Sequence, residues 1–232
     1  MPNPITSLVT STLGRKLLVA ATGLLLLGFV ISHLSGNLLI FQGQDALNSY
    51  AAFLKSMPGV LWGARIGLLV ITVVHLWGTL TLTARNRQAR PVHYQGRKSP
   101  ASTFASRWMV LSGLTILLFV IYHLLHFTVG ATHPDHYALQ ETVGEAARHD
   151  VYGMVVAGFQ IPWVSAIYIA AQILLGMHLA HGISSVVQTL GINHPTYTPL
   201  IRRGGVGLAV LLALGNCSIP VAVLAGWIGD AA

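Results

Sequence analysis

The sequence predicts an all-α integral membrane protein, a bundle of five transmembrane helices. Only 8% of its residues are charged, and its mean hydropathy is +0.67. Apolar runs longer than the roughly 18 residues that cross a bilayer recur along the chain, and no tandem repeat or change of composition marks off a second domain. We therefore expect one transmembrane domain over residues 1–232, with helices near 15–41, 60–85, 107–131, 160–189 and 205–229.

The first apolar run follows Arg15 and Lys16, as the apolar part of a signal peptide would. It is much longer than the roughly 7–15 residues of such a region, and no small-residue cleavage site precedes the polar sequence. We therefore expect it to be retained as the first helix.

Basic residues concentrate at alternate ends of the expected spans. By the positive-inside rule the richer side is cytoplasmic, which predicts a cytoplasmic N-terminus, an external C-terminus and a multi-pass protein of the inner (cytoplasmic) membrane. We expect irregular cytoplasmic connections at 86–106 and 190–203, and a short interfacial helix outside at 138–150. The richer side has Arg15, Lys16, Arg85, Arg87, Arg90, Arg97, Lys98, Arg107, Arg202 and Arg203, and the other side has Lys55, Arg65 and Arg148.

One histidine lies well inside each of the first four spans, and the four fall at two depths. At a rise of about 1.5 Å per residue, His33 and His123 lie roughly 25 Å from the cytoplasmic ends of their helices. His75 and His178 lie roughly 15 Å from theirs. The sequence therefore predicts two histidine pairs, each bridging two helices.

Two opposed imidazoles on different helices are the axial ligands that six-coordinate haem iron takes. We therefore expect two non-covalent haem b groups, one for each pair. Covalent attachment of the c type is excluded because no C-x-x-C-H motif occurs, and the lone Cys217 cannot form an internal disulfide.

Small residues follow three of the four histidines at helical spacing. A missing side chain there would let the edge of a porphyrin ring approach the backbone. The three are Gly36, Gly78 and Gly182.

Other interpretations stay open for these residues. A histidine in a transmembrane helix can simply hydrogen-bond a neighbouring helix. His126 and His181, about one turn beyond His123 and His178, are rival ligands or partners for a haem propionate or a quinone carbonyl. Arg65 would suit a propionate or would extend to the interface. The loop histidines are expected to be solvated: His93, His133, His136, His149 and His194.

Four stretches surround the span histidines: GFVISHLSGN at 28–37, VVHLWGTLT at 73–81, FVIYHLLH at 119–126 and GMHLAHGISSVVQTLGI at 176–192. Their order, spacing and placement resemble the cytochrome b membrane-anchor subunit of succinate dehydrogenase and fumarate reductase, in the di-haem form with a single five-helix anchor. The resemblance covers nearly the whole chain. It implies that His33 and His123 bind a distal haem and that His75 and His178 bind a proximal one, and it favours His178 over His181.

The resemblance implies a subunit of succinate:quinone oxidoreductase. Family members anchor a flavoprotein with covalent FAD and an iron–sulfur protein at the cytoplasmic face, and they exchange electrons with a quinone, usually menaquinone. This chain has no dinucleotide-binding glycine fingerprint and no cysteine cluster. Succinate oxidation, FAD and the iron–sulfur clusters are therefore expected only in partner subunits, in a complex that binds no nucleic acid and that can form a higher oligomer.

The expected route takes electrons from a docked iron–sulfur cluster through the inner and then the outer haem to a quinone near the outer side. Candidates for the quinone pocket are Asn37, Gln42, Asp45 and Asn48, with His126 and Arg65 nearby. Two alternatives come from other classes. A di-haem anchor of another quinone-linked complex, such as a hydrogenase, would share the histidine pairs. A haem-free transporter would carry broken helices and charged midplane residues, and the latter are missing from this sequence.

Overall fold

The computed structural model describes residues 4–89, 108–192 and 194–229. Within these residues, five helices are long and apolar enough to cross a membrane, which confirms the expected all-α transmembrane architecture. They are α2 (Thr12–Asn37), α4 (Pro58–Gln88), α6 (Met109–His123) together with the helical turn that continues it to Thr128, α9 (Pro162–Thr189) and α10 (Tyr197–Leu224).

The observed helix ends differ from the expected ones at two places. The connection expected at 190–203 is helical from Tyr197 onward, because Pro199 lies in the first turn of α10, where its missing N–H costs no hydrogen bond. The third span changes form directly after His123, where a π-helical turn runs over Leu124–Thr128. Most of the connection expected at 86–106 lies outside the described residues, together with His93, Arg90, Arg97, Lys98 and Arg107.

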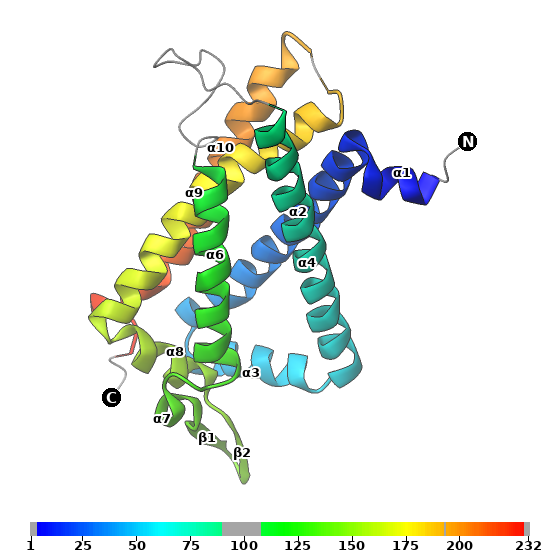
Figure 1. The fold of residues 1–232 in the computed structure, drawn as a ribbon. Coiled ribbons are helices and arrows are strands. Elements are labelled where there is room, and N and C mark those ends of the chain that lie inside the picture. Colours follow the sequence, from blue (N-terminus) through cyan, green and yellow to red (C-terminus); the bar gives the residue numbers. More distant parts are fainter. Residues whose placement is uncertain (1–3, 90–107, 193, 230–232) are drawn as a thin grey trace.

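The short elements gather at one end of the bundle, here called the hairpin end (Figure 1). Between α2 and α4 it holds a 3₁₀ turn (Leu38–Gln42) and α3 (Gln44–Lys55). The opposite end, here called the basic end, holds α1 (Pro4–Thr10) and the α9–α10 connection, so α1 and the last turn of α10 lie at opposite ends of the bundle (Figure 1). Between α6 and α9 the hairpin end holds α7 (Pro134–Tyr137), β1 (Gln140–Val143), β2 (Ala146–His149) and α8 (Val151–Phe159).

The interfacial helix expected at 138–150 is wrong, because this segment is mostly a β-hairpin. Strands β1 and β2 pair antiparallel, with Gln140 opposite His149 and Val143 opposite Ala146. The two-residue turn begins with Gly144 at φ +63°, a conformation that glycine adopts without strain and that would interrupt a helix.

Charge divides between the two ends. Every carboxylate side chain in the described part of the chain lies at the hairpin end. The basic end carries six basic side chains and the hairpin end three, as the positive-charge count from the sequence predicted. The six are Arg15, Lys16, Arg85, Arg87, Arg202 and Arg203, and the three are Lys55, Arg65 and Arg148.

A cluster of buried apolar side chains packs the bundle at the hairpin end. It joins the turn after α2, α3, α8, the first half of α9 and the last turns of α10. Because these elements meet there, the hairpin end fixes the positions of helices that are far apart in the sequence. The cluster comprises Ile40, Leu47, Val156, Phe159, Val164, Tyr168, Ile219, Ala222, Val223 and Ile228.

A polar network lies beside this cluster. The carboxylate of Asp150 accepts hydrogen bonds from Gln44 Nε2 (2.9 Å), Asn48 Nδ2 (2.8 Å) and the backbone N–H of Gly153 (2.8 Å). Asp150 thereby caps α8 and ties it to α3. Asp150 is 9% exposed, and its bond to Asn48 is buried.

Arg148 of β2 joins the hairpin to α3 in a second way. Its guanidinium pairs with Glu141 and, at 2.7 Å, with Asp45. The Arg148 guanidinium lowers the pKa of the Asp45 carboxyl, so this ion pair persists above the lowered value and is lost as the pH falls through it. Asp45 is highly exposed, and the pair therefore orients the hairpin more than it stabilises the fold.

Replacement of Asp150 by alanine would remove the acceptor of Gln44 Nε2, one of the two acceptors of the buried Asn48 Nδ2, and the side-chain cap of α8. We expect the opening equilibrium of the hairpin end to rise roughly 30-fold, equivalent to about 2 kcal/mol. Hydrogen exchange of the α3 and hairpin amides in the Asp150→Ala protein measures this. Glu145→Ala, at the exposed turn of the hairpin, is the matched control. Equal exchange in the two variants would contradict the role given to Asp150.

Candidate functional site

His33 of α2 and His123 of α6 meet near the hairpin end, and we call them the hairpin-side pair. Their ring centroids are 5.8 Å apart and their planes lie at 85°. Two metal–imidazole bonds of about 2 Å each would place the bonding nitrogens about 4 Å apart, with the ring centres somewhat farther. His33 and His123 therefore lie together, as their depths predicted, at a spacing close to that of two opposed axial ligands, and their binding of haem stays a prediction.

Aromatic rings line the hairpin-side pair. Phe29 stacks on His33 with centroids 5.2 Å apart, and Phe119 lies 5.9 Å from His123. The hydroxyl of Tyr168 lies 3.4 Å from Nδ1 of His123. These contacts hold both imidazoles in an apolar surrounding and limit their rotation.

His75 of α4 and His178 of α9 form the second pair, here called the basic-side pair. Contacts with Thr22 of α2 and Ser112 of α6, which stand at equal spacing from His33 and His123, place the two rings at one level of the bundle. Each ring also contacts a hydroxyl of a third helix. Nδ1 of His75 lies 3.0 Å from Thr22 Oγ1, and Nδ1 of His178 lies 3.2 Å from Ser112 Oγ.

Along α2 and α6, each of these hydroxyls precedes a histidine of the hairpin-side pair by 11 residues. The two histidine pairs are therefore separated by about 16 Å along the helix axes. The two levels predicted from the sequence are therefore present, with a separation wider than the roughly 10 Å between the two predicted depths.

Two of the three glycines expected to leave room beside the histidines have another role, while a Cβ on Gly182 would meet nothing within 4 Å and its role stays a prediction. A Cβ on Gly36 would meet the ring of Tyr50 at 2.6 Å, and a Cβ on Gly78 would meet Val19 Cγ2 at 2.6 Å, so these glycines serve packing between helices. A Cβ on Gly23 would instead lie 3.4 Å from His75, and one on Gly113 would lie 3.5 Å from His178. The sequence holds a signal that was missed. A hydroxyl residue stands 11 residues before each of His33 and His123, and a glycine stands 10 residues before each.

The rival ligands lie apart from the paired rings. His126 is 1% exposed, stacks on Phe127 with centroids 3.9 Å apart, and lies 3.1 Å from the Tyr168 hydroxyl through Nδ1. Its Nε2 has no hydrogen-bond partner among the described residues and faces the backbone of Gly158. His126 is therefore packed into the protein wall, where its ring lies 4.8 Å from that of His133 and stacks on Phe127.

His181 and Arg65 have other neighbours. His181 is half-buried and lies about one turn beyond His178 on α9, toward the basic end. Arg65 is exposed, and its guanidinium lies over the ring of Trp62 at 5.1 Å from the centroid. A propionate contact for Arg65 stays a prediction.

The four residues expected to line a quinone pocket all lie at the hairpin end. Asn37 ends α2 one turn beyond His33, and Gln42 is exposed at the end of the 3₁₀ turn. Asp45 pairs with Arg148. Asn48 is 1% exposed and its amide is fully engaged, because Nδ2 donates to Glu141 (2.6 Å) and Asp150 and Oδ1 accepts from the backbone of Tyr152. Their contact with a quinone stays a prediction.

The expectation of solvated loop histidines is wrong for three of them. His133, His136 and His149 are half-buried. His133 lies 4.8 Å from His126 and stacks on His136, while His149 Nε2 lies 2.8 Å from the Tyr137 carbonyl, because α7 and the hairpin fold back onto the bundle. His194 is exposed, as expected.

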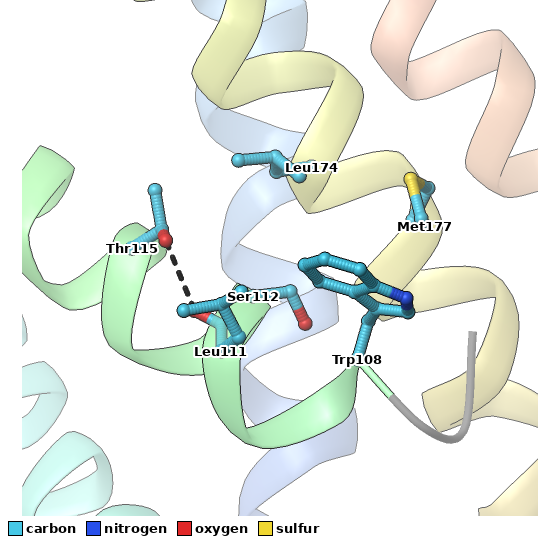
Figure 2. Close-up of a pocket in the computed structure, with 6 residues that line it drawn as sticks. All are labelled: Trp108, Leu111, Ser112, Thr115, Leu174 and Met177. Carbon is cyan, nitrogen blue, oxygen red and sulfur yellow. Dashed lines mark hydrogen bonds between the residues drawn. The ribbon is translucent and has the colours of Figure 1, made fainter. Parts of the chain in front are cut away.

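An apolar cavity of about 340 Å³ lies between α6 and α9 beside the basic-side pair (Figure 2). It reaches this pair through Ser112, whose hydroxyl contacts His178. The Thr115 hydroxyl donates to the Leu111 carbonyl of its own helix, so the lining is largely apolar (Figure 2). The lining residues are Trp108, Leu111, Ser112, Thr115, Leu174 and Met177.

Comparisons with protein-family models, with curated proteins and with solved structures found no match to this chain.

The neighbouring hydroxyls of Tyr168 and Tyr122 make a matched pair for a stability test. Tyr168 contacts His126, whereas the buried hydroxyl of Tyr122 has no hydrogen-bond partner in the described part of the chain. We expect Tyr168→Phe to cost about 1–2 kcal/mol because Nδ1 of His126 is left unpaired, and Tyr122→Phe to change stability by less than about 0.5 kcal/mol. Thermal unfolding in detergent compares them. A larger loss for Tyr122→Phe would contradict this assignment.

Proposed function

We propose that the protein is a di-haem cytochrome b, the membrane-anchor subunit of a succinate:quinone oxidoreductase. It would carry electrons through two b haems between a docked iron–sulfur subunit and a membrane quinone, with menaquinone as the expected quinone. The observation that supports this most directly is the close approach of His33 and His123 from different helices, at 5.8 Å.

The residues present fit haem ligation at both levels. Haem iron needs only two protein ligands on opposite faces of its ring, and each level offers an imidazole from each of two helices. At the basic-side pair, Gly23 and Gly113 leave room beside the rings, and hydroxyls hold Nδ1 of both, so Nε2 is the nitrogen available to a metal. Haem bound there would supply reversible one-electron chemistry.

The chain itself would set the position and the environment of these groups. The four helices hold the imidazoles at fixed heights, and the aromatic rings around the hairpin-side pair exclude water. A low-polarity surrounding and hydrogen bonds to the ligands are the means by which a protein tunes a haem potential.

The basic end is the proposed docking face for the iron–sulfur and flavoprotein subunits. This assignment follows from the positive-inside rule, which puts the end with six described basic side chains in the cytoplasm. FAD and the iron–sulfur clusters belong to these partners. The quinone would then react near the hairpin end, where Asn37 and Gln42 lie one to three turns beyond His33.

A haem count tests the proposal. Purified wild-type chain should contain about two b haems by pyridine haemochrome and a reduced-minus-oxidised b-type spectrum. His75→Ala and His123→Ala should each contain about one, because each removes an axial ligand from a different site. His194→Ala, at an exposed position outside the bundle, should keep both. A wild-type chain without haem would overturn the proposal and leave the histidines with a structural role.

The electron donor separates the two di-haem candidates. In the native complex purified with its partner subunits, succinate should reduce the b haems, and the fumarate–succinate couple should set their redox state. Hydrogen gas under the same conditions should not. Reduction by hydrogen and not by succinate would instead identify the anchor of a hydrogenase.

A further inference from the structure

Helices α2 and α6 carry the same arrangement of three residues. A hydroxyl residue is followed by glycine, and a histidine of the hairpin-side pair comes 11 residues after the hydroxyl. Eleven residues make about three helical turns, so hydroxyl and histidine lie on one face of each helix. The residues are Thr22, Gly23 and His33 in α2, and Ser112, Gly113 and His123 in α6.

Both hydroxyls contact the basic-side pair in the same way. Thr22 Oγ1 of α2 lies 3.0 Å from Nδ1 of His75 in α4, and Ser112 Oγ of α6 lies 3.2 Å from Nδ1 of His178 in α9. The glycine that follows each hydroxyl leaves space against the same ring, because a Cβ there would stand 3.4 or 3.5 Å from the imidazole Cε1. The two contacts are independent, since they involve different helices and different residue types.

Each hydroxyl also lies within hydrogen-bonding distance of a carbonyl of its own helix. Thr22 Oγ1 is 2.7 Å from the Leu18 carbonyl, and Ser112 Oγ is 3.1 Å from the Met109 carbonyl. A carbonyl only accepts, and a hydroxyl has one hydrogen and two acceptor lone pairs. Both contacts of each hydroxyl are therefore hydrogen bonds when it donates to the carbonyl and accepts from Nδ1. In that arrangement the ring hydrogen is on Nδ1, and the lone pair of the neutral ring is on Nε2.

We propose that Thr22 and Ser112 are positioning residues that fix the Nδ1–H tautomer and the orientation of His75 and His178, so that Nε2 of both rings is presented to one shared ligand. This inference rests on the proposed function for the identity of that ligand, haem iron. A hydrogen bond to the outer nitrogen makes an imidazole a stronger donor and fixes its ring. Each of α2 and α6 thus serves both sites, with a ligand for one and an anchoring acceptor for the other.

Redox titration of single-haem backgrounds tests the inference. In His123→Ala protein, which would keep the basic-side haem, Thr22→Val and Ser112→Ala should each move the midpoint potential to a more positive value, because a weaker donor stabilises ferric iron less. The low-spin electron paramagnetic resonance signal should shift, and haem retention should fall about 10-fold or more. In His75→Ala protein, which would keep the hairpin-side haem, the same substitutions should leave the potential unchanged.

Matched variants separate positioning from packing. Thr22→Ser and Ser112→Thr keep the acceptor and should restore the wild-type potential and spectrum. Thr115→Val removes a hydroxyl from α6 that bonds only its own helix, and it should behave as wild type.

The failure of the inference is distinguishable from that of the proposed function. Two haems in the wild type, with Thr22→Val and Ser112→Ala indistinguishable from Thr115→Val, would overturn the inference alone. Equal shifts in both single-haem backgrounds would also overturn it. Absence of haem from the wild type would overturn the proposed function first.

Discussion

The arrangement of the bundle depends on how four imidazoles are accommodated inside apolar helices. A polar ring in hydrocarbon is costly unless its nitrogens have partners. At the basic-side pair, one nitrogen of each ring is held by a hydroxyl from another helix. At the hairpin-side pair, the rings contact one another and aromatic side chains, with the Tyr168 hydroxyl near His123. Contacts of the histidines therefore link four helices: α2 meets α6 through His33 and His123, α2 meets α4 through His75, and α6 meets α9 through His178.

The hairpin end supplies the rigidity that this arrangement needs. The buried cluster and the Asp150 network connect α3, α8, α9 and α10 beside the hairpin-side pair. Toward the basic end, contact between helices depends on small residues, as where a Cβ on Gly205 would meet Ile183 at 2.7 Å. The span helices otherwise present large apolar side chains outward, which suits contact with lipid.

The sequence was sufficient for the spans and for the histidine pairing because both depend on simple periodic quantities. Apolar run length predicts a crossing, and residue count from the span ends predicts the depth at which His33 meets His123. The hydroxyl contacts were not predicted, because Thr22 and Ser112 look like residues that bond their own helix, which they also do. The β-hairpin was not predicted, because its turn depends on the positive φ angle of Gly144, which glycine allows but does not require.

The separation of charge between the two ends has an electrical consequence. The basic end of the described chain carries six basic side chains and no carboxylate, whereas the hairpin end carries three basic and five acidic side chains. The molecule is thus a permanent dipole along the membrane normal. A transmembrane voltage acts on such a dipole with about 2.3 kcal/mol per elementary charge for each 100 mV. An energised membrane, negative inside, therefore favours insertion with the basic end inward and opposes inversion of the bundle.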